Sequence, residues 1–334
     1  MEQFSLTDIK KKNLSDVYHY IYMNPSCSKQ DIATALSVSL PTVSQHLTTL
    51  ESEQLIEKCG RLSSSVGRRA NAYQIISDAK IAIGLEILPH TTHILSINLY
   101  GKMIAKETLP VSFEASAAYF SKLKKAVKNF CQINHHKAES ILGIGLGVQG
   151  LISPDGSELT YGKILDCTGM SIDLFSDAFH VPCKFVHDAE CACTSELWEN
   201  PDITDATYIS LGYHLGGAII VDGATGKSGT FEHMTLVPNG LDCYCGRKGC
   251  AECYCSGNSL LSDCDNLDEF FSRKVTGDPS CLAKWDEYLR HLSILINNLH
   301  MVLEHTVILG GCNTIFHGRR YGIYPFLCSR TFNI

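Results

Sequence analysis

Apolar side chains recur every three or four positions in the first fifty residues, which is the spacing of amphipathic helices. This pattern predicts three short helices, over residues 13–24, 28–36 and 41–50. Pro25 ends the first helix and Ser28 caps the second, while the third begins on a proline, which suits a first helical turn. The third helix has a polar outward face made of Thr42, Ser44, Gln45, His46, Thr48 and Thr49.

The second and third predicted helices are joined by a tight turn and the outward face of the third has no acidic residue, which is typical of a helix-turn-helix. In that motif the second helix enters the major groove of DNA. We expect the amide of Gln45 to read an adenine edge and the hydroxyl groups to hold phosphates. The residues predicted to contact DNA from this helix are Thr42, Ser44, Gln45, His46 and Thr49.

Residues 55–58 then begin a strand, and residues 60–75 resemble the wing of a winged helix. The tip of this wing is basic, with Arg61, Arg68 and Arg69 beside glycine and serine, so it is expected to reach the minor groove or the DNA backbone. The alternative is a small helical module that binds another protein. Residues 1–76 are therefore predicted to form a winged helix-turn-helix domain.

Beyond residue 76 the pattern changes to alternating strands and helices, which indicates an α/β domain over residues 77–334. Strand-like apolar runs occur at residues 81–104, 141–152 and 208–223, and an amphipathic helix is expected at 115–133. Residues 285–302 carry a long apolar stripe that predicts a core helix or a dimer interface: Leu289, Leu292, Leu295, Ile296, Leu299 and Val302.

The composition limits the class of protein. The chain of 334 residues is 45% hydrophobic, with no apolar run of 18 residues and no apolar segment at its start, so a soluble, cytoplasmic protein without membrane contact is expected. The 16 cysteines then indicate free thiols and a metal site. The net charge is −7, but residues 1–76 carry 8 Lys and Arg against 7 Asp and Glu, so the predicted head does not share the acidity that would repel phosphates.

One imidazole and three thiols fall close together in the sequence, at His233, Cys243, Cys245 and Cys250. Four such ligands suit tetrahedral Zn²⁺ and leave no position for water, so one structural zinc ion per chain is predicted. Two glycines between the last two thiols allow a tight loop. Cys253 and Cys255 follow at once and leave the choice of ligands open. The alternative is that these cysteines are small buried apolar residues.

The segment from His233 through C-Y-C-G-R-K-G-C to Glu252 resembles the zinc signature of the ROK family of repressors, open reading frames and sugar kinases. The resemblance implies a two-lobed, actin-like (ribonuclease H-like) sugar-kinase fold in which the zinc loop braces a sugar pocket. The predicted winged helix resembles the head of the repressor branch, which the kinases lack. The expected partners are operator DNA, a sugar or sugar phosphate, and a second copy of the chain in a homodimer or larger homo-oligomer.

The resemblance also assigns a sugar pocket. Gln149 and Gly150 resemble the family's Pro-Gly turn, and Asp188 stands where the kinases have their catalytic base, with His187 in place of an asparagine. The family's Glu-x-Gly-His has become a sequence that starts with Thr230. The residues predicted to face the sugar are Gln149, Gly150, His187, Asp188, Thr230, His233 and Glu252.

Both phosphate loops depart from the pattern of the kinases. Leu88 and Pro89 replace glycines of the first loop, and Tyr213 and His214 replace the Thr-Gly of the second. Without those glycines the backbone has less room to approach phosphates, and proline lacks an N–H. We therefore expect a repressor without enzymatic activity; an ATP-dependent sugar kinase with an accessory head is the alternative. The family's closing helices are expected to be shortened here, and a non-functional remnant is a third reading.

Overall fold

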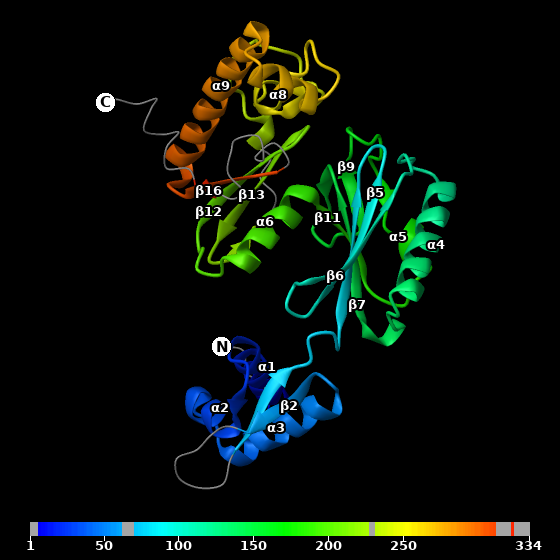
Figure 1. Ribbon diagram of the computed structural model, residues 1–334, viewed down its shortest axis with the longest axis vertical. Helices are drawn as coiled ribbons and strands as arrows, with labels where there is room; N and C mark the ends of the chain where they lie inside the picture. The colour runs from blue at the N-terminus through cyan, green and yellow to red at the C-terminus, as the bar shows by residue number, and fades with distance from the viewer. Residues whose placement is uncertain (1–5, 62–69, 227–230, 312–321, 324–334) are drawn as a thin grey trace. The chain divides into compact units, whose positions relative to one another are not determined.

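The computed structural model describes residues 6–61, 70–226, 231–311 and 322–323 (Figure 1). Contacts divide the chain into two units, which are described separately. The first unit joins the residues up to Ile83 to Leu95–Glu107 and Lys128–Ile144, and the second holds the rest. In the part of the chain described, no helix is long and apolar enough to cross a membrane.

The N-terminal head contains three helices and a three-stranded antiparallel sheet of order β1-β3-β2. The predicted helix-turn-helix is therefore present, with the described part of the predicted wing in β2 and β3. The elements are α1 (Leu6–Met23), β1 (Cys27–Ser28), α2 (Lys29–Leu36), α3 (Leu40–Ser52), β2 (Ile56–Arg61) and β3 (Asn71–Ile75).

Local hydrogen bonds explain where α2 and α3 begin. The Ser28 side chain accepts a hydrogen bond from the N–H of Asp31, and the Asp31 carboxylate accepts one from the N–H of Ser28, which is a capping box. Ser39 caps α3 by accepting from the N–H of Thr42 at 3.3 Å. Ser37 ends α2 in the left-handed region. These caps fix the turn that sets α3 apart from α2.

A five-stranded sheet follows, of order β11-β7-β4-β5-β6. The predicted apolar run at residues 81–104 forms parts of three of its strands, and the predicted helix at 115–133 is α4. These elements are β4 (Ile81–Ile87), β5 (Thr92–Asn98), β6 (Met103–Leu109), α4 (Ala117–Ile133), β7 (Ile141–Val148) and β11 (Cys183–His187).

A second five-stranded sheet has the order β14-β13-β12-β15-β16, in which β12 pairs antiparallel with β13 and parallel with β15. Helix α6 packs on its β12 and β13 strands (Figure 1). The elements are α6 (Asp188–Glu199), β12 (Ala206–Leu211), β13 (Leu215–Val221), β14 (Ala224–Thr225), β15 (Thr306–Gly310) and β16 (Gly322–Ile323). A small sheet of order β10-β9-β8 comprises β8 (Leu151–Ile152), β9 (Glu158–Tyr161) and β10 (Met170–Ser171).

The long helix α9 (Pro279–Leu303) packs against α8 (Leu267–Val275) and carries most of the predicted apolar stripe into the core of the second unit. Leu292, Leu295 and Leu299 are buried in that core, together with the Trp285 and Tyr288 rings, which stack 5.3 Å apart. Val302 was expected on this stripe, but it is 77% exposed because the helix ends one residue later. The stripe is therefore core, except at its end.

Candidate functional site

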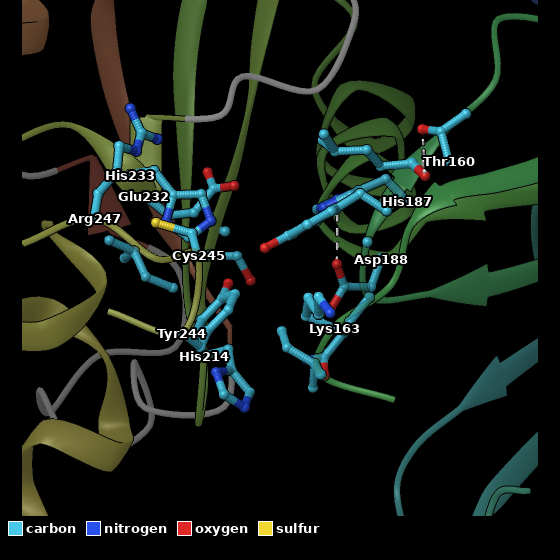
Figure 2. A pocket seen from close by; sticks show the side chains of 18 residues that line it. Thr160, Lys163, His187, Asp188, His214, Glu232, His233, Tyr244, Cys245 and Arg247 are labelled. Carbon is cyan, nitrogen blue, oxygen red and sulfur yellow. Dashed lines mark hydrogen bonds and ion pairs between the residues drawn. The ribbon is translucent and has the colours of Figure 1, made fainter. Parts of the chain in front are cut away.

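A cavity of about 410 Å³ lies within the second unit. Its walls come from segments far apart in the sequence: the turn after β7, the corner between β11 and α6, the β12–β13 hairpin, the short helix η2 (Phe231–His233) and the loop of the cysteines. Figure 2 shows the side chains of η2 and the cysteine loop on one side and His187 with Asp188 on the other. Such a concave, mixed polar and apolar space is typical of a small-molecule site.

The turn after β7 brings Gln149 and Gly150 to the cavity, as the resemblance implied. Gly150 has φ of 144°, and a Cβ atom there would come within 2.5 Å of the Tyr161 carbonyl oxygen. Only glycine fits this backbone between the turn and the end of β9. The glycine therefore shapes the wall of the cavity.

The corner between β11 and α6 places His187 and Asp188 on the opposite side (Figure 2). His187 is the N-cap of α6, and its Nδ1 atom accepts a hydrogen bond from the N–H of Ala189 at 3.2 Å. Asp188 Oδ1 accepts from the same N–H at 2.7 Å, and its side chain remains 33% exposed. The helix N-terminus thus orients a carboxylate that is open to the cavity.

Glu252 was expected to face the sugar, but both of its oxygens are engaged by the protein. Oε1 lies 2.7 Å from Nδ1 of His214, and Oε2 accepts from the N–H of Leu215 at 2.7 Å. The residue is 5% exposed and is not among those that line the cavity, whereas His214 and Leu215 are. Glu252 therefore holds two residues that line the cavity, His214 and Leu215, without lining it itself.

Glu232 lines the cavity, and sequence reasoning did not single it out. It occupies the place of the glycine in the family's Glu-x-Gly-His, and that departure was the available signal. The residue is 7% exposed, and its Oε2 atom has no hydrogen-bond partner in the structure. Burial, reinforced by the nearby carboxylates of Glu252 and Asp188, raises the pKa of Glu232 to about 7.

The four predicted metal ligands come together in the described chain. The candidate ligand atoms of His233, Cys243, Cys245 and Cys250 all lie within 4.8 Å of one another. The loop that carries them turns at Gly246 and Gly249, whose φ angles are 84° and 71°. Although burial opposes it, hydrogen bonds from the backbone and side chain of Arg247 lower the pKa of Cys245, which favours the thiolate that binds metals. This group is a candidate metal centre.

The two following cysteines differ in their surroundings, and the Cys253 thiol also interacts with that of Cys243. Cys253 Sγ lies 3.6 Å from the carbonyl oxygen of Asp242 and 4.0 Å from that of Leu241. Cys255 is fully buried in the hydrophobic core of the second unit. Neither belongs to the group of four.

Further lining residues, which the sequence analysis did not select, come from β9, the segment after it and the cysteine loop. Thr160 and Lys163 line the side of His187, while Tyr244 and Arg247 line the side of the cysteine loop (Figure 2). The Tyr244 ring packs edge-on against the imidazoles of His233 and His214, with centroids 5.1 and 5.8 Å away. Tyr244 therefore links the candidate metal centre to the wall of the cavity.

In the head, Gln45 is exposed on α3, and Thr42, Ser44 and Thr49 are partly exposed. The Ser44 hydroxyl lies 2.8 Å from Nζ of Lys29, a residue of α2 that the sequence analysis did not select. Lys29 and Ser44 line a groove between α2, α3 and the β2–β3 pair, as does Thr48. The described face of α3 is thus polar and accessible.

The prediction that His46 lies on the outward face of α3 is wrong, because the residue is buried with only 8% of its surface exposed. The buried stripe of α3 runs through Val43, His46, Leu47 and Leu50, which have the spacing i, i+3, i+4 and i+7 of one helical face. Burial also lowers the pKa of His46. His46 therefore belongs to the core of the head.

Arg68, Arg69 and Thr230 lie outside the described residues. Arg61 ends β2, with its backbone paired to Asn71.

Comparisons with known proteins agree with this arrangement. The ROK family matches residues 82–318, and a winged helix-turn-helix DNA-binding family matches residues 12–57. A xylose repressor from Caldicellulosiruptor bescii is 25% identical over 94% of this chain and 86% of its own length. A glucokinase from Halalkalibacterium halodurans is 24% identical over 69% of this chain and 79% of its own.

Among solved structures, the fold resembles a ROK family transcriptional regulator described as a homolog of the E. coli MLC protein. The TM-score is 0.76 at 18% identity, over 92% of this chain and 86% of the other. The similarity extends over the head as well as the domain with the cavity. The family match spans more than half of the chain, and the chain therefore belongs to the ROK family.

Proposed function

We propose that this protein is a transcriptional repressor whose binding to operator DNA responds to a sugar held in the cavity. The observation that carries the proposal is the presence of a winged helix-turn-helix and a ROK domain on one chain. The similar proteins include xylose repressors from two genera, which makes xylose the first effector to test. The proposed contacts to DNA are Thr42, Ser44, Gln45, Thr49, Arg61, Arg68 and Arg69.

The proposed sugar site uses polar groups from both sides of the cavity. The Asp188 carboxylate and the imidazole of His187 lie on one side, and His233 lies on the other (Figure 2). A carboxylate accepts hydrogen bonds from sugar hydroxyls without any transfer of phosphate. Gln149 and Gly150 complete the proposed contacts at the turn after β7.

We also propose that the four ligands hold one structural zinc ion. Zn–S bonds of about 2.3 Å in a tetrahedron place neighbouring ligand atoms roughly 3.8 Å apart. The Cys245 and Cys250 sulfurs are 3.7 Å apart, and the Cys243 sulfur lies 3.6 Å from Nδ1 of His233. Three thiolates and one imidazole favour zinc over harder cations. The ion would fix the loop that carries Tyr244 and Arg247.

The kinase alternative is supported by the similar glucokinase and by the position of Asp188. The first loop argues against it, because the N–H of Leu88 donates to the carbonyl of Thr91 at 2.9 Å and Pro89 has no N–H. Phosphoryl transfer depends on such groups for positioning. ATP-dependent phosphorylation of xylose or glucose that disappears in Asp188→Ala would establish a kinase instead.

The function is tested by measuring operator binding of the full chain with and without sugar. A protein that works as a homodimer should recognise a two-fold symmetric site. Xylose should weaken operator binding by binding more tightly to the conformation of the protein that has low operator affinity. A ligand shifts the equilibrium between two conformations only by the difference between its affinities for them. Asp188→Ala should bind the operator normally and no longer respond. A sugar that binds tightly and leaves operator affinity unchanged would contradict the proposed regulation.

A further inference from the structure

The inference concerns Glu232, whose carboxylate lies in the wall of the cavity. The residue is 7% exposed, and Oε2 is buried without a hydrogen-bond partner in the structure. A buried polar atom without a partner is destabilising, so its presence calls for an explanation. Figure 2 shows Glu232 beside His233, on the side of the cavity that faces Asp188. Glu232 lines the cavity, so its carboxyl group lies in the wall that a ligand would contact.

Residues on both sides of Glu232 are anchored, so its backbone cannot move away from the cavity. The Phe231 ring packs on Gly217 of β13 so closely that a Cβ atom at that glycine would overlap the ring. His233 belongs to the candidate metal centre. The short helix η2 is closed by a hydrogen bond from the N–H of Met234 to the carbonyl of Phe231 at 2.9 Å. The carboxylate is thus held in advance of any ligand.

The neighbouring acidic groups already have partners within the protein. Glu252 is occupied by His214 and the backbone of Leu215, each at 2.7 Å. Asp188 accepts from the N–H of Ala189 at 2.7 Å. Of these three carboxylates, only that of Glu232 has a buried oxygen without a partner among the described residues.

We propose that Glu232 is a specificity-determining residue whose carboxyl group, in the wall of the cavity, hydrogen-bonds one hydroxyl group of the effector sugar. In the family pattern a carboxylate stands two positions earlier, where this chain has Thr230. Glu232 supplies a carboxylate from a different position, which changes the hydroxyl that is recognised. This inference rests on the proposed function of the cavity as a sugar site.

The test compares Glu232→Leu with Glu252→Leu in the full chain, since both replace a buried carboxylate with an apolar side chain of similar size. Without sugar, Glu232→Leu should raise the melting temperature because it removes an unpaired polar atom. Glu252→Leu should lower it because His214 and Leu215 lose their partner. Zinc content should match the wild type in Glu232→Leu. An equal loss of stability in both variants would show that Glu232 is structural and overturn the inference.

The second readout is sugar affinity, measured by calorimetry with xylose, glucose and their deoxy analogues. Glu232→Leu should bind the preferred sugar roughly 3- to 10-fold more weakly, as expected for the loss of one hydrogen bond. One deoxy analogue should bind the wild type and the variant equally, which identifies the hydroxyl. Unchanged affinity in the variant overturns the inference alone. If the wild type binds none of these sugars, the proposed function fails and the inference fails with it.

Discussion

Nδ1 of His214 lies 2.7 Å from Oε1 of Glu252, and the two side chains are 25% and 6% exposed. The imidazole stands where the family's second phosphate loop has glycine, and the carboxylate stands where the resemblance implied a contact to the sugar. Each side chain is thus a hydrogen-bond partner of the other. His214 lines the cavity, and Glu252 holds its ring in place.

The pair leads to a prediction about stability. His214→Ala should lower the free energy of unfolding by about 1–3 kcal/mol, because Oε1 of Glu252 loses its partner in a buried place. Urea unfolding of the full chain measures this change. Asn258→Ala is the matched control, since its amide contacts the other ring nitrogen of His214 at 3.4 Å. If the control variant is destabilised as much as His214→Ala, the contact between His214 and Glu252 is not the cause.

The candidate metal centre gives a second prediction. Purified protein should contain about one zinc ion per chain, and Cys243→Ser should lose most of the metal and melt at a lower temperature. Cys253→Ser should keep both, because Cys253 is outside the group of four residues whose ligand atoms lie within 4.8 Å of one another. Elemental analysis with thermal melting decides between the two cysteines. Equal metal loss in both variants would show that Cys253 is a ligand.

DNA binding should separate base recognition from phosphate contact. Gln45→Ala should reduce discrimination between operator and altered sequences, because Gln45 is exposed on α3. Arg68→Ala should weaken binding to every sequence and reduce the dependence on salt by about one counterion. Titrations at several salt concentrations measure both effects. Equal operator affinity in a chain without residues 1–76 would contradict the role of the head.

The fourth prediction concerns acid stability of the head. Burial lowers the pKa of His46, so the unfolded state binds a proton more readily than the folded state. The stability should be complete above the unfolded pKa of about 6.5 and should decline as the pH falls below it. His46→Leu should remove this part of the decline and raise the melting temperature at acidic pH. The exposed His19, replaced in the same way, should leave the acid profile unchanged.

The head and the group of four candidate metal ligands were predictable because their signals are local. Caps such as Ser28 and the spacing of Val43, Leu47 and Leu50 act within a few residues, so the sequence indicates the helices directly. The prediction that His46 faces outward was wrong although its signal is local too. Its type suggested a polar face, but its position on the same helical stripe decides its burial.

The cavity was only partly predictable because its residues meet through pairing of distant strands. The resemblance supplied Gln149, His187 and Asp188, which follow strands at corners of the fold. Lys163 lies after β9 in no motif, so its place in the cavity depends on the folded sheets. Glu252 has a partner 38 positions earlier, and this pairing cannot be read from either local sequence.

The short helix η2 has a consequence for how this protein can diversify. Its first residue is fixed in the core by contact with Gly217, and its last is fixed in the candidate metal centre. The backbone of the middle position therefore depends little on which side chain it carries. A single substitution at residue 232 can alter the chemical groups presented to a ligand while the surrounding fold stays intact. Related chains could acquire new inducers through this one codon, without first losing a stable protein.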